Sequence, residues 1–188
     1  MLLVPASTWV LVGCQSPPRE HTSPAEPAGT NMVVGEPVWP DVSEVNREAF
    51  SAMPGEARER IKTSRVPVWL PHNPTWLGSA KVVSKELWTT VHLRGDDATI
   101  VVSASRGAHK LAGVTPMEGN RRVRGKGAFV SQNEGIWSAN WVESGVSYSV
   151  EVECDVPSSA SCASENKVLD VANALVFVGG KGRAEVLP

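Results

Sequence analysis

The chain has 188 residues, which suits one ordinary domain and makes a second full domain unlikely. Hydrophobic residues make up 41% and charged residues 20% of the chain, a composition too apolar for wholesale disorder. Because 18 basic residues nearly balance 20 acidic ones, no global field attracts nucleic acid, and we expect no nucleic-acid partner.

An uncharged apolar stretch runs from Leu2 to Val12, and it is too short for a membrane-spanning helix, which needs ~20 apolar residues. It leads into Leu11-Val12-Gly13-Cys14, which resembles the lipobox of bacterial lipoproteins, although no Lys or Arg precedes the apolar run. The resemblance implies that residues 1–13 are a signal peptide and that Cys14 is acylated and anchors the chain to a membrane. The alternative is a buried first strand with a core cysteine.

Residues 14–31 combine this anchor with a tether that is rich in proline and has no aliphatic side chain larger than alanine up to Thr30. Such a segment cannot build a core, so it predicts an extended, solvated linker. In lipoproteins of two-membrane bacteria, an aspartate directly after the lipidated cysteine favours the inner membrane, and here that position is Gln15. The resemblance therefore implies an outer-membrane lipoprotein whose single domain, residues 32–188, faces the periplasm or the cell surface.

Helical features come first in this domain. Asp41 or Ser43 can cap a first turn, and Pro54 with Glu56 suits the start of a second helix. The helical region ends before 66–71, where two prolines favour an extended path at a sheet edge or in a covering loop.

The apolar period then changes to two, which predicts strands. The expected strands are 87–93, 100–104, 126–132, 136–142 and 146–154. Turn residues at 94–97 favour a hairpin between the first two, and 133–135 and 143–145 are the next turns. In the last strand, the alternation from Val146 to Cys154 predicts one core face and one solvent face.

A final helix is expected after Ser164, which can cap it, with apolar residues at helical spacing from Val168 to Leu175, and Gly179-Gly180 is expected to stop it. Its apolar stripe should pack on the sheet. The predicted fold class is α+β: an antiparallel meandering sheet with a C-terminal helix packed on one face and a short N-terminal helical region.

The three cysteines fit the exported location. If Cys14 carries lipid, Cys154 and Cys162 remain as a pair, and they close a short loop in a compartment that permits a disulfide. The alternative is half of a metal site, but no histidine lies within twenty residues of either thiol. We therefore expect no metal and no cofactor.

The run from Trp141 to Val150, followed by the helix, resembles the C-terminal ends of small uncharacterised domains in exported lipoproteins and in sensor regions of anti-sigma factors. The shared motif is a tryptophan strand, a glycine turn and a tyrosine strand. The resemblance implies binding or sensing rather than catalysis.

Catalytic motifs have little local support. The histidines form no close-spaced zinc motif, no G-x-S-x-G elbow occurs, and Arg124-Gly125-Lys126-Gly127 lacks the spacing of a phosphate-binding loop. Many serines are present, so a hydrolase with a triad assembled in space stays open as an alternative.

Two groups of side chains are candidates for a ligand or partner surface: the basic cluster and the tryptophans, which number seven in the chain. The members we single out are Arg121, Arg122, Arg124, Lys126, Trp88, Trp137 and Trp141. Four nearby cations create a local field, and tryptophan faces suit glycan, peptide or lipid. The alternatives are a solvated, aggregation-blocking turn and ordinary core tryptophans. If Leu87 and Val91 face the core, Trp88 is exposed.

These observations lead to one hypothesis, a membrane-anchored lipoprotein with a non-enzymatic role in envelope binding or assembly. Its partners would be the membrane, through the lipid, and an envelope protein or glycan. The alternatives are a sensor-type regulatory domain of the envelope and a small envelope hydrolase.

Overall fold

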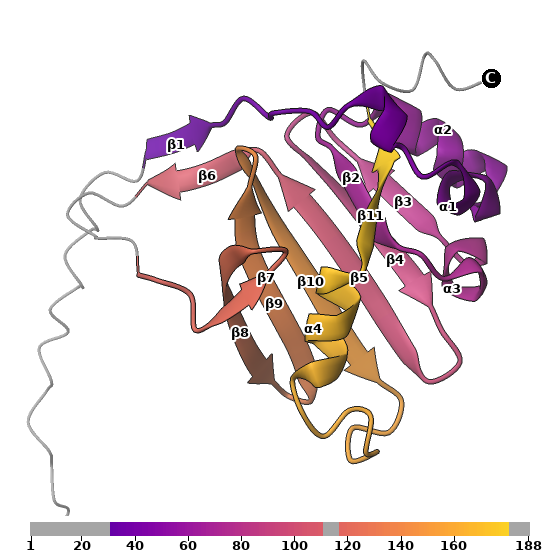
Figure 1. Ribbon diagram of the computed structural model, residues 1–188, viewed down its shortest axis with the longest axis vertical. Helices are drawn as coiled ribbons and strands as arrows, with labels where there is room; N and C mark the ends of the chain where they lie inside the picture. Colours follow the sequence, from indigo (N-terminus) through magenta and orange to yellow (C-terminus); the bar gives the residue numbers. More distant parts are fainter. Residues whose placement is uncertain (1–30, 111–116, 181–188) are drawn as a thin grey trace, which may run out of the picture.

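A computed structural model describes residues 31–110 and 117–180, and its largest element is a seven-stranded antiparallel sheet (Figure 1). The strands, in spatial order, are β3 (Lys81–Ser84), β4 (Trp88–Arg94), β5 (Ala98–Ser105), β10 (Val146–Cys154), β9 (Ile136–Glu143), β8 (Lys126–Asn133) and β7 (Arg121–Val123). Pairing of β5 with β10 joins two meanders into one sheet. The predicted α+β class with an antiparallel sheet is confirmed, as are the five predicted strands.

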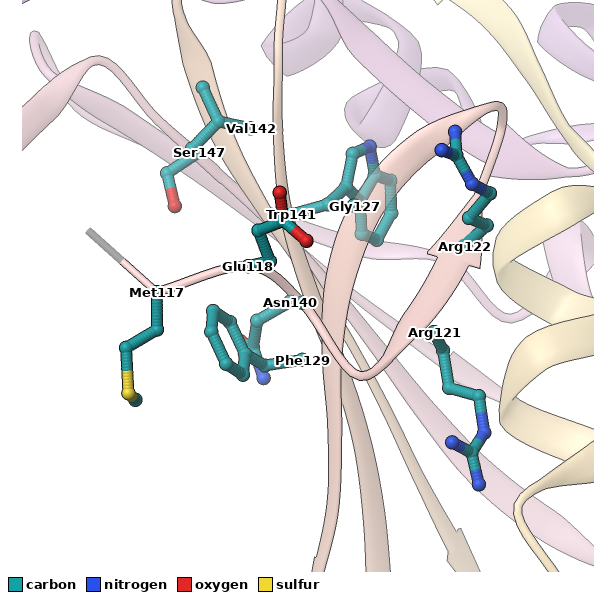
Figure 2. Close-up of a pocket in the computed structure, with 11 residues that line it drawn as sticks. Met117, Glu118, Arg121, Arg122, Gly127, Phe129, Asn140, Trp141, Val142 and Ser147 are labelled. Carbon is teal, nitrogen blue, oxygen red and sulfur yellow. The ribbon is translucent and has the colours of Figure 1, made fainter.

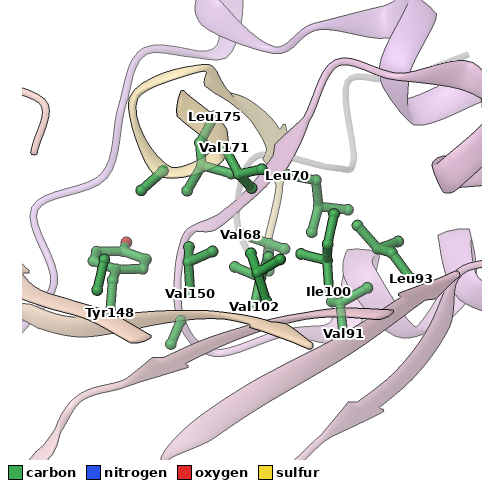
Figure 3. Packing of buried hydrophobic residues seen from close by; sticks show 14 of the residues in the cluster. Val68, Leu70, Val91, Leu93, Ile100, Val102, Tyr148, Val150, Val171 and Leu175 are labelled. Carbon is green, nitrogen blue, oxygen red and sulfur yellow. The ribbon is translucent and has the colours of Figure 1, made fainter. Parts of the chain in front are cut away.

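One face of this sheet is covered. The covering elements are α4 (Asn166–Asn173) and a ribbon of two antiparallel strands, β2 (Val68–Pro71) and β11 (Leu175–Gly179). Figure 3 shows Val150, Val102 and Ile100 rising from the sheet towards the side chains of this layer. The predicted alternation in β10 is confirmed, because every second residue from Val146 to Cys154 is buried.

The N-terminal helices lie towards the β3–β4 end of the sheet (Figure 1). They are the 3-10 turn η1 (Val42–Glu44), α1 (Arg47–Ala52), α2 (Gly55–Thr63) and α3 (Pro74–Gly78). Asp41 caps η1 as predicted, because its carboxylate accepts from the amide of Ser43 at 2.9 Å and its own amide donates to Glu44 at 2.8 Å. The second predicted helix also begins where expected, directly after Pro54.

The C-terminal helix is shorter than predicted. It packs on the covered face as expected, but it ends at Asn173, and Leu175 belongs to β11 instead. The predicted cap is also wrong, since Glu165 takes the N-cap position without a side-chain hydrogen bond. The run from Leu175 to Gly179 contains valine and phenylalanine, which favour a strand, and its backbone pairs with the distant β2.

Three hairpin turns connect the strands from β7 to β10. Their central residues are Arg124-Gly125, Glu134-Gly135 and Ser144-Gly145, and all six have positive φ values, from 49° to 86°. Two consecutive left-handed residues are typical of a two-residue type I′ hairpin, in which glycine favours the second position. The turns predicted at 133–135 and 143–145 are thus confirmed, and the basic run 121–126 contains the third.

Two further features involve long-range pairing. A disulfide joins Cys154, at the end of β10, to Cys162 in the loop before α4, as predicted. Strands β1 (Asn31–Val34) and β6 (Gly107–Lys110) form a small ribbon that the sequence did not predict. The expected signal peptide, Cys14 and most of the tether lie outside the described residues. No helix in the described ranges is long and apolar enough to cross a membrane.

Candidate functional site

The second face of the seven-stranded sheet is exposed over β8, β9 and β10. Its side chains alternate with the buried ones: Phe129 on β8, Asn140 and Val142 on β9, and Ser147 on β10 are all exposed. Phe129 is 42% exposed and Val142 is 64% exposed, although both are large apolar residues. We call this side of the sheet the outer face.

A trough of about 780 Å³ lies on the outer face, and Figure 2 shows the residues around it. It is lined by Met117, Glu118, Gly119, Arg121, Arg122, Gly127, Phe129, Asn140, Trp141, Val142 and Ser147. Phe129 and Asn140 are cross-strand partners in this lining. The volume falls within the usual range for small-molecule sites, roughly 300–1,000 Å³.

The wall of the trough depends on Asn120. Its side-chain oxygen accepts from the amide of Val130 at 2.9 Å, and its side-chain nitrogen donates to the carbonyl of Val130 at 3.0 Å. The Asn120 side chain therefore makes the two hydrogen bonds to the edge of β8 that the backbone of a neighbouring strand would otherwise make. The preceding segment, 117–119, crosses over that strand. Gly119 lies so close that a Cβ there would overlap the backbone of Ala128, so the crossing requires glycine.

The floor of the trough carries exposed polar side chains, Asn140 and Ser147. Ser147 lies opposite Val142 in the register, and Asn140 lies between Phe129 and Ser149. Asn140 and Ser147 are exposed, and their side chains have no hydrogen-bond partner within the described ranges. These groups are therefore available to water or to a ligand.

The charges around the trough are balanced. Glu118 is one lining residue, and Arg122 is another, whose guanidinium donates to the carbonyl of Gly125 at 3.1 Å. Arg121 also lines the trough, but its guanidinium pairs with Glu165 at 2.6 Å, on the α4 side (Figure 2). One acidic and one basic group therefore face the trough without an ion-pair partner in the described part of the chain.

The structure separates the predicted basic cluster. Arg121 is held by its ion pair, and Arg124 turns to the covered side, where it pairs with Glu143 at 2.9 Å and lies over the ring of Trp69 at 3.9 Å. Lys126 is exposed beside the β7–β8 turn. Only Arg121 and Arg122 of the four cations line the trough.

The predicted tryptophans divide between the two faces. Trp137 and Trp141 share one face, as their parity predicts, and this is the covered face. Trp141 is 4% exposed and stacks on Tyr148 with ring centroids 5.5 Å apart, and the indole of Trp137 donates to the carbonyl of Cys162 at 3.0 Å. Trp88 is on the outer face, 39% exposed, as the parity of β4 predicts.

Catalytic or metal-binding groups do not gather in the part of the chain that the structure describes. His72 approaches Glu48 at 3.4 Å, His92 lies on the outer side of β4 opposite Lys81, and His109 lies on β6. No histidine hydrogen-bonds a serine between residues 31 and 110 or between 117 and 180. No group of three metal-ligating side chains occurs in those ranges either.

Sequence reasoning missed several lining residues, namely Met117, Glu118, Phe129, Asn140, Val142 and Ser147. The strand alternation identifies the last four as outward-facing, but it does not reveal that segment 117–119 closes one side.

No family model, curated protein or solved structure matches this chain.

Proposed function

We propose that the chain is a lipid-anchored protein of a bacterial cell envelope, attached to the outer membrane through acylated Cys14, and that it binds an envelope component in the trough. The role is one of binding or assembly, without a catalytic residue or cofactor. The observation that carries the proposal is the pair of exposed polar side chains on the trough floor, Asn140 and Ser147, beside exposed Phe129; neither has a hydrogen-bond partner among the residues that the structure describes.

Phe129 and Val142 are large apolar side chains that stay exposed in the folded domain. Because these two side chains keep much of their surface in water, their burial contributes little to the stability of the fold. Apolar surface in a concave site instead favours ligand binding. Hydroxyl and amide groups around the apolar residues then supply orientation, because they both donate and accept hydrogen bonds. This combination supports a binding site more than a solvated strand face.

Two observations support the anchor and the compartment. The lipobox resemblance at Leu11–Cys14 implies acylation, and the disulfide between Cys154 and Cys162 suits an oxidising location outside the cytoplasm. The proline-rich tether would hold the domain away from the membrane, so that the trough stays accessible.

The anchor is tested by the intact mass of the protein extracted from membranes of its native host, measured before and after reduction and alkylation. We expect a chain that starts at Cys14 and carries acyl mass, with two alkylatable thiols only after reduction. A chain that retains residues 1–13 without a modification would overturn the anchor.

Binding is tested with the full chain carrying Cys14→Ser, so that lipid does not drive sedimentation, mixed with purified outer-membrane fragments. We expect Ser147→Tyr, which fills the trough, to weaken co-sedimentation at least tenfold. The matched control is Ser131→Tyr, on the outer side of β8 but outside the trough, which should bind like the parent. Equal sedimentation of the Ser147→Tyr variant and the parent would show that the trough is not the binding site.

A further inference from the structure

We infer that the ligand of the trough is an uncharged glycan that lies across the strands, over β8, β9 and β10. This inference rests on the function proposed above and specifies its ligand. It follows from four properties of the site: an exposed aromatic ring, exposed hydroxyl and amide groups with no partner among the described residues, balanced charge, and a continuation across the sheet towards Trp88.

The apolar contacts suit a sugar ring. Phe129 is exposed at the trough, which Met117 also lines, and Val142 lies two residues from Asn140 on the neighbouring strand. A pyranose has apolar C–H faces that pack on an aromatic ring, while its hydroxyls point to the sides. Phe129 therefore offers the kind of platform that such a face needs.

The polar groups suit the hydroxyls of the same ligand. Asn140 and Ser147 each donate and accept, and neither has a partner within the described ranges. Glu118 adds an acceptor and Arg122 adds donors at the rim. A glycan hydroxyl also donates and accepts, so every one of these groups can be satisfied by one class of ligand.

The charge balance favours a ligand without net charge. Glu118 and Arg122 offset one another, and the third charged lining residue, Arg121, is already neutralised by Glu165 at 2.6 Å. A phosphate-bearing headgroup or an acidic polysaccharide would place its anion near the Glu118 carboxylate without a surplus of cations to compensate. Such like-charge proximity opposes binding.

A peptide or an acyl chain fits the trough less well. Peptides that add to a sheet pair with a strand edge, whereas the trough lies over the faces of β8, β9 and β10, and the edge of β8 is occupied by β7 and the Asn120 side chain as far as Val130. An acyl chain needs an apolar enclosure. Here the floor contains the exposed side chains of Asn140 and Ser147, whose hydrogen-bonding groups an acyl chain would leave unpaired.

The register extends the site towards β4. Trp88 lies opposite Ser105, Ser105 lies opposite Ser147, and Ser147 lies opposite Val142, so these four residues form one row across the outer face. Three strand spacings separate the ends of the row, about 14 Å. An oligosaccharide along this row would contact Trp88 only when it is long enough to leave the trough.

The test uses the oxidised full chain with Cys14→Ser and material released from the same outer-membrane fragments. The probes are neutral oligosaccharides and acidic oligosaccharides, separated by anion exchange, and phospholipid vesicles made from the lipid extract. Binding is measured by calorimetry. We expect binding of the neutral oligosaccharides, a loss of at least tenfold in Phe129→Ala, and no loss in the control Val83→Ala, an exposed apolar residue on β3.

Chain length provides a second readout. Trp88→Ala should weaken binding of long neutral oligosaccharides several-fold and leave disaccharides and trisaccharides unchanged. Preference for the acidic oligosaccharides or for the vesicles would overturn the inference. If fragments still sediment with the parent but not with Ser147→Tyr, and no neutral oligosaccharide binds, the glycan inference fails while the proposed function stands. If the fragments do not bind either, both fail.

Discussion

Arg124 illustrates how neighbouring cations in one short run acquire different roles. It lies at the first central position of the β7–β8 turn with φ of 50°, so its side chain leaves the direction of the strand. Its guanidinium then donates to Glu143 at 2.9 Å and to the carbonyl of Leu175 at 2.7 Å, while it covers the ring of Trp69. A single residue thus joins the hairpin, the β9–β10 turn and β11.

We expect Arg124→Ala to lower the free energy of unfolding by about 3 kcal/mol, because it leaves the mostly buried Glu143 carboxylate without its ion-pair partner. The matched control is Lys126→Ala, two residues away and exposed, which should change stability by less than about 0.5 kcal/mol. Urea unfolding at pH 7 measures both. Similar losses in the two variants would argue against the joining role of Arg124.

Tyr148 predicts how stability depends on alkaline pH. Burial raises the pKa of its phenol above the ordinary value, and its hydroxyl donates to the carbonyl of Pro67 at 3.2 Å. Because the pKa is higher in the folded state, this phenol's contribution to stability is complete below the unfolded pKa, about 10, and is lost as pH rises towards the folded value.

Since Tyr148 is the only tyrosine in the chain, phenolate absorbance reports its titration directly. We expect the native protein to show no phenolate at pH 10.5, whereas the urea-unfolded protein titrates near pH 10. In Tyr148→Phe, unfolding free energy should fall less between pH 9 and pH 11 than in the parent. An ordinary titration in the native state would contradict the assigned burial.

At the scale of elements, apolar periodicity predicted the strands and their faces correctly, whereas the cap and the end of the last helix were predicted wrongly. The alternation in β10 gave the correct face for every residue from Val146 to Cys154, because one side of that strand is solvated and the other is packed. The segment from Leu175 to Gly179 has no such alternation, and a short apolar run suits a helix end and a buried strand equally. Its state is decided by pairing with β2, more than a hundred residues earlier.

The hairpin turns offer a comparison between local strain and packing. Gly125 and Gly145 have nearly the same φ, 76° and 79°, but an added Cβ would meet nothing within 4 Å at Gly125 and would stand 2.6 Å from the Glu36 carbonyl oxygen at Gly145. We expect Gly125→Ala to cost about 1–2 kcal/mol, the usual penalty for a left-handed L-residue. Gly145→Ala should cost more.

Urea unfolding of the two glycine variants gives the difference directly. The excess in Gly145→Ala measures how firmly the segment around Glu36 is held against the β9–β10 turn, where the amide of Val38 donates to the Ser144 carbonyl at 2.8 Å. Equal losses in both variants would mean that this segment moves aside without cost.

At the scale of the whole molecule, the candidate site was less predictable than the fold. Parity alone placed Trp88 on the outer face and put Trp137 and Trp141 together, because parity is a local property of a strand. The trough depends instead on the Asn120 side chain reaching Val130, which directs segment 117–119 across β8. No periodic pattern in the sequence encodes that contact.

The two faces of the sheet should also differ in what they contribute to stability. Leu93 is 1% exposed on the covered face, so Leu93→Ala should cost about 2–5 kcal/mol through lost burial and the cavity it leaves. Phe129 is 42% exposed on the outer face, and no covering layer would collapse around it. We therefore expect Phe129→Ala to cost less than about 1 kcal/mol in urea unfolding.

This asymmetry bears on the function as well as on the fold. If Phe129→Ala unfolds like the parent and yet binds the neutral oligosaccharides at least tenfold more weakly, the ring contributes to binding rather than to stability. A loss of stability comparable to that in Leu93→Ala would instead make Phe129 part of the core, and the outer face would then need another explanation for its exposed apolar residues. The two measurements on one variant thus separate a surface that folds the domain from a surface that serves a ligand.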